Sequence, residues 1–200
     1  MDPLSPEDLT RWCQRTLPYD TRAFQQLVTT YKLRVFRTAY RMIGNNADAE
    51  EIAQDVFLKV YQNIHSLDDP ATLTAWIYRI TVNVCLNELR RHKRRPNSVP
   101  LTPTNGNDSE DASLIDSVNA TPEEEALRRE LQRCIEAVLG QLNAVERAVV
   151  VLRDLENRSY QEIADSLRIG LSAAKMRIHR ARLAFQELFD RVCPDLRPAE

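Results

Sequence analysis

The chain has 200 residues, a formal net charge of −2 and a hydrophobic fraction of 43%. This length fits one or two small domains, and four glycines are too few for a sheet-rich fold with tight hairpins or for a phosphate-cradling loop. No apolar run approaches the ~20 residues of a membrane-spanning helix, and the N-terminus lacks the pattern of a signal peptide. The sequence therefore predicts an all-α, cytoplasmic protein with no membrane insertion.

The small net charge hides an uneven distribution of charged residues. Residues 1–96 carry 14 basic and 11 acidic side chains. Residues 97–127 carry no basic and 7 acidic side chains, and residues 128–200 carry 13 basic and 11 acidic side chains. Two mildly basic blocks therefore flank an acidic connector. Because the charges are segregated, the basicity that nucleic-acid binding needs must be judged segment by segment.

Four helices are predicted in the first half of the chain, at 6–17, 20–44, 47–64 and 73–92. Each has apolar residues at helical spacing. Asp20 is a candidate N-cap, Gly44 a candidate helix end, and Asp68–Pro70 breaks the third helix. The four helices are expected to form a compact domain over residues 1–95.

Residues 96–121 are rich in Pro, Asn, Ser and Asp and have no hydrophobic periodicity. This composition predicts an acidic, flexible linker. A coil of this length averages roughly 25–30 Å between its ends and reaches about 85 Å when fully extended. The linker is expected to join two separate helical domains, 1–95 and 122–200.

Three helix starts in the second domain carry the same signal, a Thr, Asn or Ser followed three residues later by Glu. The pairs are Thr121 with Glu124, Asn143 with Glu146, and Ser159 with Glu162. They predict helices at 122–139, 144–155 and 160–167, followed by a basic helix at 172–189. Val149–Leu152 is a candidate strand, but a helical apolar stripe continues through it, so a helix is preferred.

Residues 158–185 have the pattern of a helix-turn-helix. Apolar residues at helical spacing would pack its two helices together: Ile163, Ala164 and Leu167 on the first, and Ala174, Ile178 and Ala181 on the second. No acidic residue occurs from Ser166 to Gln186, and unopposed positive charge suits a helix in the major groove. A solvated amphipathic helix in an ordinary bundle is the alternative. Arg168 occupies a turn position where glycine is frequent, although Gly170 lies close by.

The sequence shows no pattern of a metal site, a disulfide framework or an enzyme active site. The four cysteines form no metal-ligand spacing and are predicted to be isolated and reduced, with neither a zinc site nor a disulfide: Cys13, Cys85, Cys134 and Cys193. His179 has no companion at metal spacing. No catalytic constellation is present, so neither enzymatic activity nor a cofactor or metal is expected.

Three segments, in order, resemble extracytoplasmic-function sigma factors, the minimal two-domain type of the bacterial sigma-70 family. They are DAEEIAQDVFLKVYQNI (48–64), TAWIYRITVNVCLNELRR (74–91) and VERAVVVLRDLENRSYQEIADSLRIGLSAAKMRIHRARLAF (145–185). The resemblance covers about residues 20–190. It implies a region 2-like domain over 1–95, which binds core polymerase and the −10 element, and a region 4-like domain over 122–200, which binds the −35 element.

The resemblance assigns the outer face of helix 47–64 to core polymerase. Glu51, Gln54, Asp55 and Leu58 lie side by side at spacings of three to four residues. The three polar residues match family contacts to the clamp helices of the β′ subunit. Asp55 stands where Glu is commoner, which keeps the charge but shortens the reach. From the residues alone, an ordinary solvated face is the alternative.

The resemblance assigns helix 73–92 and the loop before it to the −10 element, where an unstacked base of the non-template strand is captured. Leu73 and Asn83 match positions that line the base site, although Leu73 replaces an aromatic residue of some members. Trp76 and Arg79 are further candidates, with core packing as the alternative for Trp76. A basic run is a candidate phosphate track, or else a solvated helix end: Arg90, Arg91, Lys93 and Arg94.

The basic helix of the helix-turn-helix is assigned to the −35 element, beginning at Ser172. Lys175, His179 and Arg180 match positions that face the major groove. Arg177 and Arg182 would contact the DNA backbone or be partly packed. Met176 departs from a small polar residue common there, so the family's base preference does not transfer.

The resemblance implies a sigma factor that directs RNA polymerase core to promoters and starts transcription. Its implied partners are the β′ clamp helices, the β flap and promoter DNA, and family members are often held inactive by an anti-sigma factor. Two rival interpretations remain. A stand-alone helix-turn-helix regulator would bind its promoter without polymerase, and a helical adaptor would not bind DNA at all.

Overall fold

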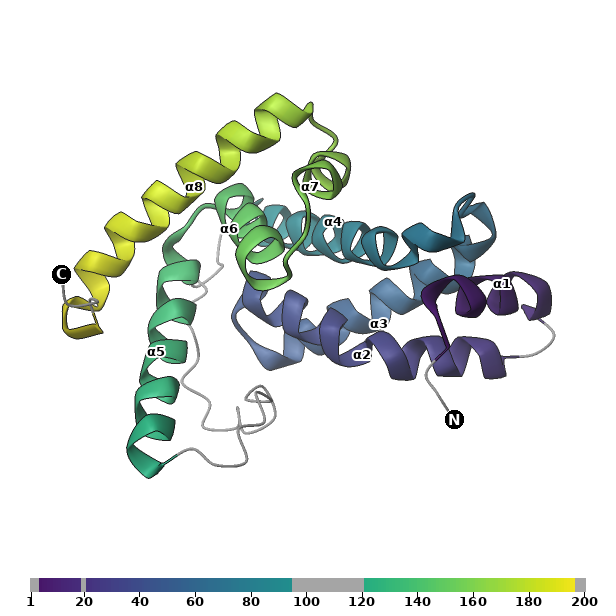
Figure 1. Ribbon diagram of the computed structural model, residues 1–200, viewed down its shortest axis with the longest axis horizontal. Coiled ribbons are helices and arrows are strands. Elements are labelled where there is room, and N and C mark those ends of the chain that lie inside the picture. Colours follow the sequence, from purple (N-terminus) through teal and green to yellow (C-terminus); the bar gives the residue numbers. More distant parts are fainter. Residues whose placement is uncertain (1–3, 19–20, 95–120, 197–200) are drawn as a thin grey trace.

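A computed structural model describes residues 4–18, 21–94 and 121–196 of the chain. Helices account for nearly all of these residues, as predicted for an all-α protein. The first half contains α1 (Pro6–Thr16), α2 (Arg22–Ile43), α3 (Asn46–Asn63) and α4 (Leu73–Arg94), with the short 3-10 turns η1 (Ile64–Ser66) and η2 (Pro70–Thr72) between α3 and α4. Helices α2, α3 and α4 pack against one another, and α1 packs against α2 (Figure 1).

The second half contains α5 (Pro122–Gln141), α6 (Ala144–Val150), α7 (Tyr160–Leu167) and α8 (Leu171–Val192). The π-helical turn η4 (Val151–Leu155) continues directly from α6, so Val149–Leu152 is helical, as predicted, rather than a strand. The 3-10 turn η5 (Pro194–Leu196) follows α8. Helix α8 packs against α5, α6 and α7, which closes this half around its own apolar side chains.

The helix starts follow the local signals in the sequence. All three predicted cap pairs of the second half form reciprocal capping boxes at the first residues of α5, α6 and α7. Each box satisfies two backbone amides that no helical carbonyl reaches. Asp20 lies outside the described residues, and Thr21, which occupies the N-cap of α2, makes no side-chain capping bond.

The apolar core of the first half lies between α2, α3 and α4. Leu27, Val56, Val60 and Ile77 are essentially inaccessible to solvent. Helix α2 ends at Gly44, which adopts a left-handed backbone with φ of 89° that favours glycine. These helix ends and buried stripes agree with the sequence-based assignment of a compact N-terminal bundle.

The two helical domains pack against each other in this structure. Helix α4 packs against α7, and α2 packs against α5 (Figure 1). Arg147 of α6 is 8% exposed and donates from Nη1 to the Met42 carbonyl at 2.5 Å, across the domain boundary. Its Nη2 donates to the Gly140 carbonyl at 2.8 Å, and burial lowers the pKa of its guanidinium. The predicted linker, 96–121, lies almost wholly outside the described residues.

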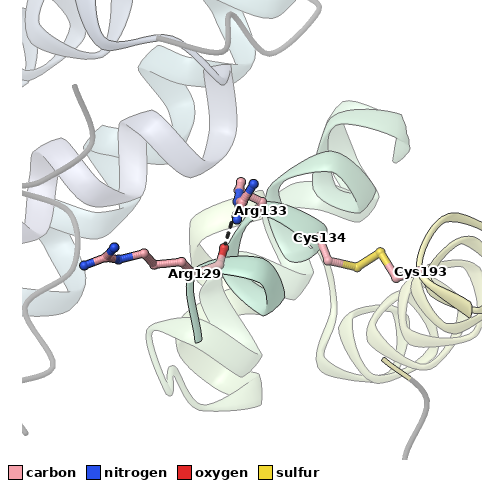
Figure 2. Close-up of a disulfide and its surroundings, with 4 residues drawn as sticks. All are labelled: Arg129, Arg133, Cys134 and Cys193. Carbon is pink, nitrogen blue, oxygen red and sulfur yellow. Dashed lines mark hydrogen bonds between the residues drawn. A yellow bond between two sulfur atoms is a disulfide. The ribbon is translucent and has the colours of Figure 1, made fainter. Parts of the chain in front are cut away.

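The prediction of four isolated cysteines is wrong for one pair. Cys134 of α5 and Cys193, directly after α8, form a disulfide with a Cα–Cα separation of 6.3 Å (Figure 2). They are 59 residues apart in the sequence and meet because α8 packs along α5. Spacing in the sequence could not indicate this tertiary contact. Cys13 and Cys85 are buried and unpaired, as predicted.

No helix among the described residues combines the length and the apolar character that crossing a bilayer requires.

Candidate polymerase and DNA interfaces

The outer face of α3 presents the residues that were predicted to meet core polymerase. Glu51, Gln54 and Asp55 are exposed, and the Leu58 side chain protrudes with 56% exposure. The opposite face of α3 is buried in the bundle, so the packing of the helix fixes the direction of this surface. The result is a polar and acidic strip with one apolar protrusion, a combination that suits a basic helical partner.

Helix α4 carries the predicted −10 residues on more than one face. Arg79, Arg90, Arg91 and Lys93 are exposed, whereas Asn83 is half-buried. Two of the basic side chains also make local bonds. Arg90 Nη1 donates to Asn87 Oδ1 at 3.0 Å, and Arg91 pairs with Glu88 at 2.8 Å. Both side chains keep much of their surface in solvent, so the basic track is accessible. The side chain of Arg94 is not among those that the structure describes.

Two of the predicted −10 residues belong to the core. Leu73, at the first position of α4, is fully buried, so its side chain is not exposed at the surface of this structure. Trp76 is 9% exposed, which agrees with the alternative of core packing. Helix α4 packs against α1 and against η2, which directly precedes it in the chain. Leu73 and Trp76 are therefore core residues beneath the exposed side chains of α4.

The helix-turn-helix consists of α7, a tight turn and α8. Ile163, Ala164, Ala174, Ile178 and Ala181 are buried, as the predicted stripes require. Helix α7 ends at Arg168, whose backbone is left-handed with φ of 53° and ψ of 50°. The Ile169 amide donates to the Ala164 carbonyl at 3.0 Å, which closes the turn as in a Schellman motif. The expectation of a turn at Arg168 is therefore confirmed, and the left-handed residue is an arginine rather than a glycine.

The face of α8 that points away from the domain is basic. It exposes Lys175, Arg177, His179 and Arg180, together with Ser172 and Met176. No ion pair with a described residue neutralises the lysine or these two arginines. Gly170 provides no side-chain cap at the start of α8, so amides of its first turn remain available to an anion. The arrangement is suited to phosphate and base contacts from one helix.

Arg182 differs from the other cations of α8. Its Nε donates to Asp154 Oδ1 and Oδ2 at 3.1 and 3.2 Å, and its Nη2 also contacts Asp154 Oδ1. The hydrogen bond that Arg182 donates to Asp154 is the main reason that the pKa of Arg182 is raised. The pair ties α8 to η4, and the Arg182 side chain remains 49% exposed.

A cluster that sequence reasoning missed joins the two domains. Glu156, which follows η4, accepts from Arg41 Nη1 at 2.7 Å, from Thr38 Oγ1 at 3.2 Å and from the Tyr78 hydroxyl at 2.6 Å. The Arg158 guanidinium lies 4.8 Å from the centroid of the Tyr78 ring. These five residues are called the interdomain latch below. Burial, followed by the hydrogen bond to Glu156, raises the pKa of Tyr78 far above its ordinary range.

The interdomain latch uses a different face of α4 from the exposed Arg79. Tyr78 is directed toward the C-terminal domain, whereas Arg79, the next residue along the helix, is exposed to solvent. No local pattern indicates the interdomain latch, because Thr38 and Glu156 are 118 residues apart in the sequence. The contact therefore leaves the exposed basic track of α4 accessible while it joins the domains.

The C-terminal domain also contains an apolar pocket of about 350 Å³ between α5, α6, η4 and α8. Its lining is Ile135, Val150, Asp154, Leu155, Arg182, Phe185 and Phe189. The two phenylalanine rings stack with their centroids 6.1 Å apart. A concave apolar site whose lining includes one ion pair suits an apolar segment of a partner.

Comparison with known proteins matches both halves of the chain. Residues 27–95 match Sigma-70 region 2, and residues 132–185 match Sigma-70, region 4. The chain is 33% identical over 171 residues to the ECF RNA polymerase sigma factor SigW of Bacillus subtilis (strain 168), an alignment that covers 84% of this chain and 89% of SigW.

Two solved structures are also similar. CnrH, in complex with the cytosolic domain of CnrY, gives a TM-score of 0.65 at 24% identity and covers 93% of this chain and 97% of CnrH. The sigma factor RpoE in complex with the anti-sigma factor NepR, from Bartonella quintana, gives 0.59 at 25% identity, with 84% and 96% covered. The region matches and the similarity to SigW establish that this chain belongs to the extracytoplasmic-function (ECF) sigma factors of the sigma-70 family.

Proposed function

We propose that this chain directs RNA polymerase core to specific promoters and starts transcription there, in the cytoplasm and without catalysing a reaction itself. The observation that carries the proposal is the exposed basic face of α8 on a helix-turn-helix, in a chain that belongs to the ECF sigma factors. A recognition helix needs unpaired cations and an accessible N-terminal turn. Helix α8 offers both.

The strip of Glu51, Gln54, Asp55 and Leu58 is proposed to bind the clamp helices of the β′ subunit. All four side chains point into solvent from one face of α3, and none is needed for the core of the bundle. Acidic groups opposite a basic coiled coil favour fast and correctly oriented association. Leu58 supplies the apolar anchor that such a polar contact needs.

Helix α4 is proposed to bind the −10 element through Arg79 and Asn83, with Arg90, Arg91, Lys93 and Arg94 following the phosphates. Helix α8 is proposed to bind the −35 element through Lys175, His179 and Arg180, with Ser172, Met176, Arg177 and Arg182 beside them. Arg182 would act from its ion pair with Asp154. The apolar pocket of the C-terminal domain is proposed to receive an apolar segment of the β flap.

The spacing of the promoter elements implies that the domains separate during function. About 16–17 base pairs at 3.4 Å each place the two elements roughly 55 Å apart along the duplex. The interdomain latch holds α4 and the C-terminal domain together in this structure. We therefore propose that the closed arrangement belongs to the chain without polymerase, and that polymerase binding opens it. An anti-sigma factor, like the one bound to RpoE of Bartonella quintana, is a proposed competitor for the same chain.

Promoter binding with and without core polymerase tests the proposal. Labelled promoter fragments selected from a library are mixed with the full chain, with core, or with both, and resolved by gel shift. We expect sequence-specific binding only in the mixture that contains both proteins. Strong specific binding by the chain alone would identify a stand-alone regulator instead.

A further inference from the structure

The disulfide site occupies one end of the α5–α8 contact. Cys134 is 6% exposed on α5, and Cys193 is half-buried immediately after α8. Their Cα atoms, 6.3 Å apart, lie inside the roughly 4.4–6.8 Å range in which a disulfide forms without backbone movement. In Figure 2 the two side chains point at each other across the gap between the helices. The packing therefore places two thiols in a position to react with each other.

The other two cysteines provide a comparison for this pair. Cys13 and Cys85 are fully buried in the N-terminal bundle and make no disulfide. Burial raises the pKa of the Cys13 thiol to about 11 and that of Cys85 to about 12. Because the thiolate is the reactive form, both are expected to be inert near neutral pH. The chain thus contains one cysteine pair placed to form a disulfide and two buried, unpaired cysteines that serve as internal controls.

A disulfide in a protein that works beside RNA polymerase is unusual. Cytoplasmic thiols are kept reduced, and the disulfides found there are usually transient or redox-sensing. This step rests on the proposed function, which places the chain in that compartment. We propose that Cys134 and Cys193 form a reversible redox site that responds to peroxide and controls the apolar pocket of the C-terminal domain.

The oxidation balances with hydrogen peroxide as the oxidant. The Cys193 thiolate, on the more exposed residue, attacks one peroxide oxygen, and the leaving hydroxide takes up a proton as water. The Cys193 sulfenic acid is then attacked by the Cys134 sulfur, which forms the S–S bond and releases a second water. Two thiols lose two electrons and two protons, and one peroxide becomes two waters. A dithiol reductant reverses the reaction and is itself oxidised to a disulfide.

The position of the pair explains why its state would affect the pocket. Ile135, the residue after Cys134, and Phe189, one turn before Cys193, both line the pocket. The S–S bond therefore ties together the two helices that form one end of it. The Asp154–Arg182 ion pair lies farther toward the N-terminus of α8, and the basic face lies beyond that. Reduction should loosen the last turns of α8 and leave the DNA-facing turns unchanged.

Two measurements on the full chain test the proposal. After treatment with peroxide or with dithiothreitol, the protein is unfolded, alkylated and analysed by mass spectrometry. We expect peroxide to protect Cys134 and Cys193 from alkylation, and Cys13 and Cys85 to be labelled in both samples. Amide hydrogen exchange over residues 186–193 should be at least fivefold faster in the reduced protein, with no change over residues 172–180.

Matched variants separate redox chemistry from a loss of folding. Cys193→Ser, at the half-exposed position, should remove both the peroxide response and the difference in exchange, and Cys134→Ala should do the same from the other helix. Cys13→Ala should retain both effects. The proposal is overturned if both thiols stay open to alkylation after peroxide, or if the bond forms and the exchange over 186–193 does not change. If the redox proposal fails in this way, the reduced chain should still bind promoters in the presence of core polymerase. If neither the reduced nor the oxidised chain binds promoters with core polymerase, the proposed function is contradicted.

Discussion

The hydroxyl of Tyr78 donates a 2.6 Å hydrogen bond to Glu156 Oε2 and so joins α4 to the C-terminal domain. Tyr78 is 5% exposed, and the Glu156 side chain is 10% exposed and also paired with Arg41 at 2.7 Å. A poorly solvated carboxylate is stabilised only while its hydrogen-bond and ion-pair partners are present. Loss of one partner leaves the negative charge of the carboxylate incompletely compensated. The closed arrangement therefore depends on specific polar contacts as well as on apolar packing.

Tyr78→Phe should weaken the contact between the domains. It removes one hydrogen bond to a charged group, which costs on the order of 1.5–3 kcal/mol, while the ring can still stack beneath Arg158. We expect fluorophores attached to the two domains to report a larger mean distance, and small-angle scattering to report a larger radius of gyration. Tyr61→Phe is the matched control, because Tyr61 packs on Phe24 within the first domain.

The same pair of fluorophores tests whether core polymerase opens the interdomain latch. Addition of core enzyme to the wild-type chain should lengthen the distance, and Tyr78→Phe should start from a longer one. An unchanged distance in the holoenzyme would show that the closed arrangement persists during function and would refute this part of the account.

Arg168→Gly should stabilise the C-terminal domain by roughly 0.5–1 kcal/mol. Arg168 has a left-handed backbone, with φ of 53°, and its exposed side chain makes no hydrogen bond with the described residues. Glycine adopts this conformation without the Cβ penalty of ~1–2 kcal/mol. Part of this gain is lost because glycine has greater conformational freedom in the unfolded chain. Urea denaturation measures the difference, with Arg168→Ala, which keeps the strain, as control. A lower midpoint for the glycine variant than for the alanine variant contradicts the interpretation.

Glu162 should make the stability of the helix-turn-helix dependent on pH. Burial acts to raise its pKa, but hydrogen bonds from Ser159 and the charge of Arg158 outweigh burial and hold the pKa below its ordinary value. A lowered folded pKa stabilises the protein above the unfolded value of about 4.3, and this contribution is lost as the pH falls through the folded value.

Comparison of wild type with Glu162→Gln isolates the effect. The wild type should have the higher urea midpoint at pH 7, and the difference should shrink at pH values below about 4. Glu187→Gln, at an exposed position of α8, should show no such change. A wild-type advantage that persisted unchanged at pH 3 would assign the effect to side-chain shape rather than to charge.

Local features of the fold could be read from the sequence because their causes are local. Cap pairs and apolar stripes involve residues three or four positions apart, and they located α5, α6 and α7 correctly at their first residues. The exposure of Lys175 and Glu51 followed from the same periodicity. The resemblance to a family supplied the partners, which periodicity alone could not.

The features that sequence reasoning missed are all tertiary. The Cys134–Cys193 bond and the Tyr78–Glu156 contact each join residues separated by more than 50 positions. Leu73 was expected to line the base site, whereas it is fully buried at the start of α4, a helix that packs against α1 and η2. Such positions depend on how whole helices pack, and no spacing along one helix encodes that packing.

Run-off transcription from a specific promoter with reconstituted holoenzyme separates DNA binding by α8 from core binding by α3. One variant reverses the basic face of α8, Lys175→Glu with Arg180→Glu, and the other reverses the strip on α3, Glu51→Lys with Asp55→Lys. All four side chains are exposed, so both variants should fold. We predict that the first variant binds core polymerase but yields no specific transcript, and that the second fails to bind core. Normal specific transcription by the first variant would show that α8 does not read promoter DNA.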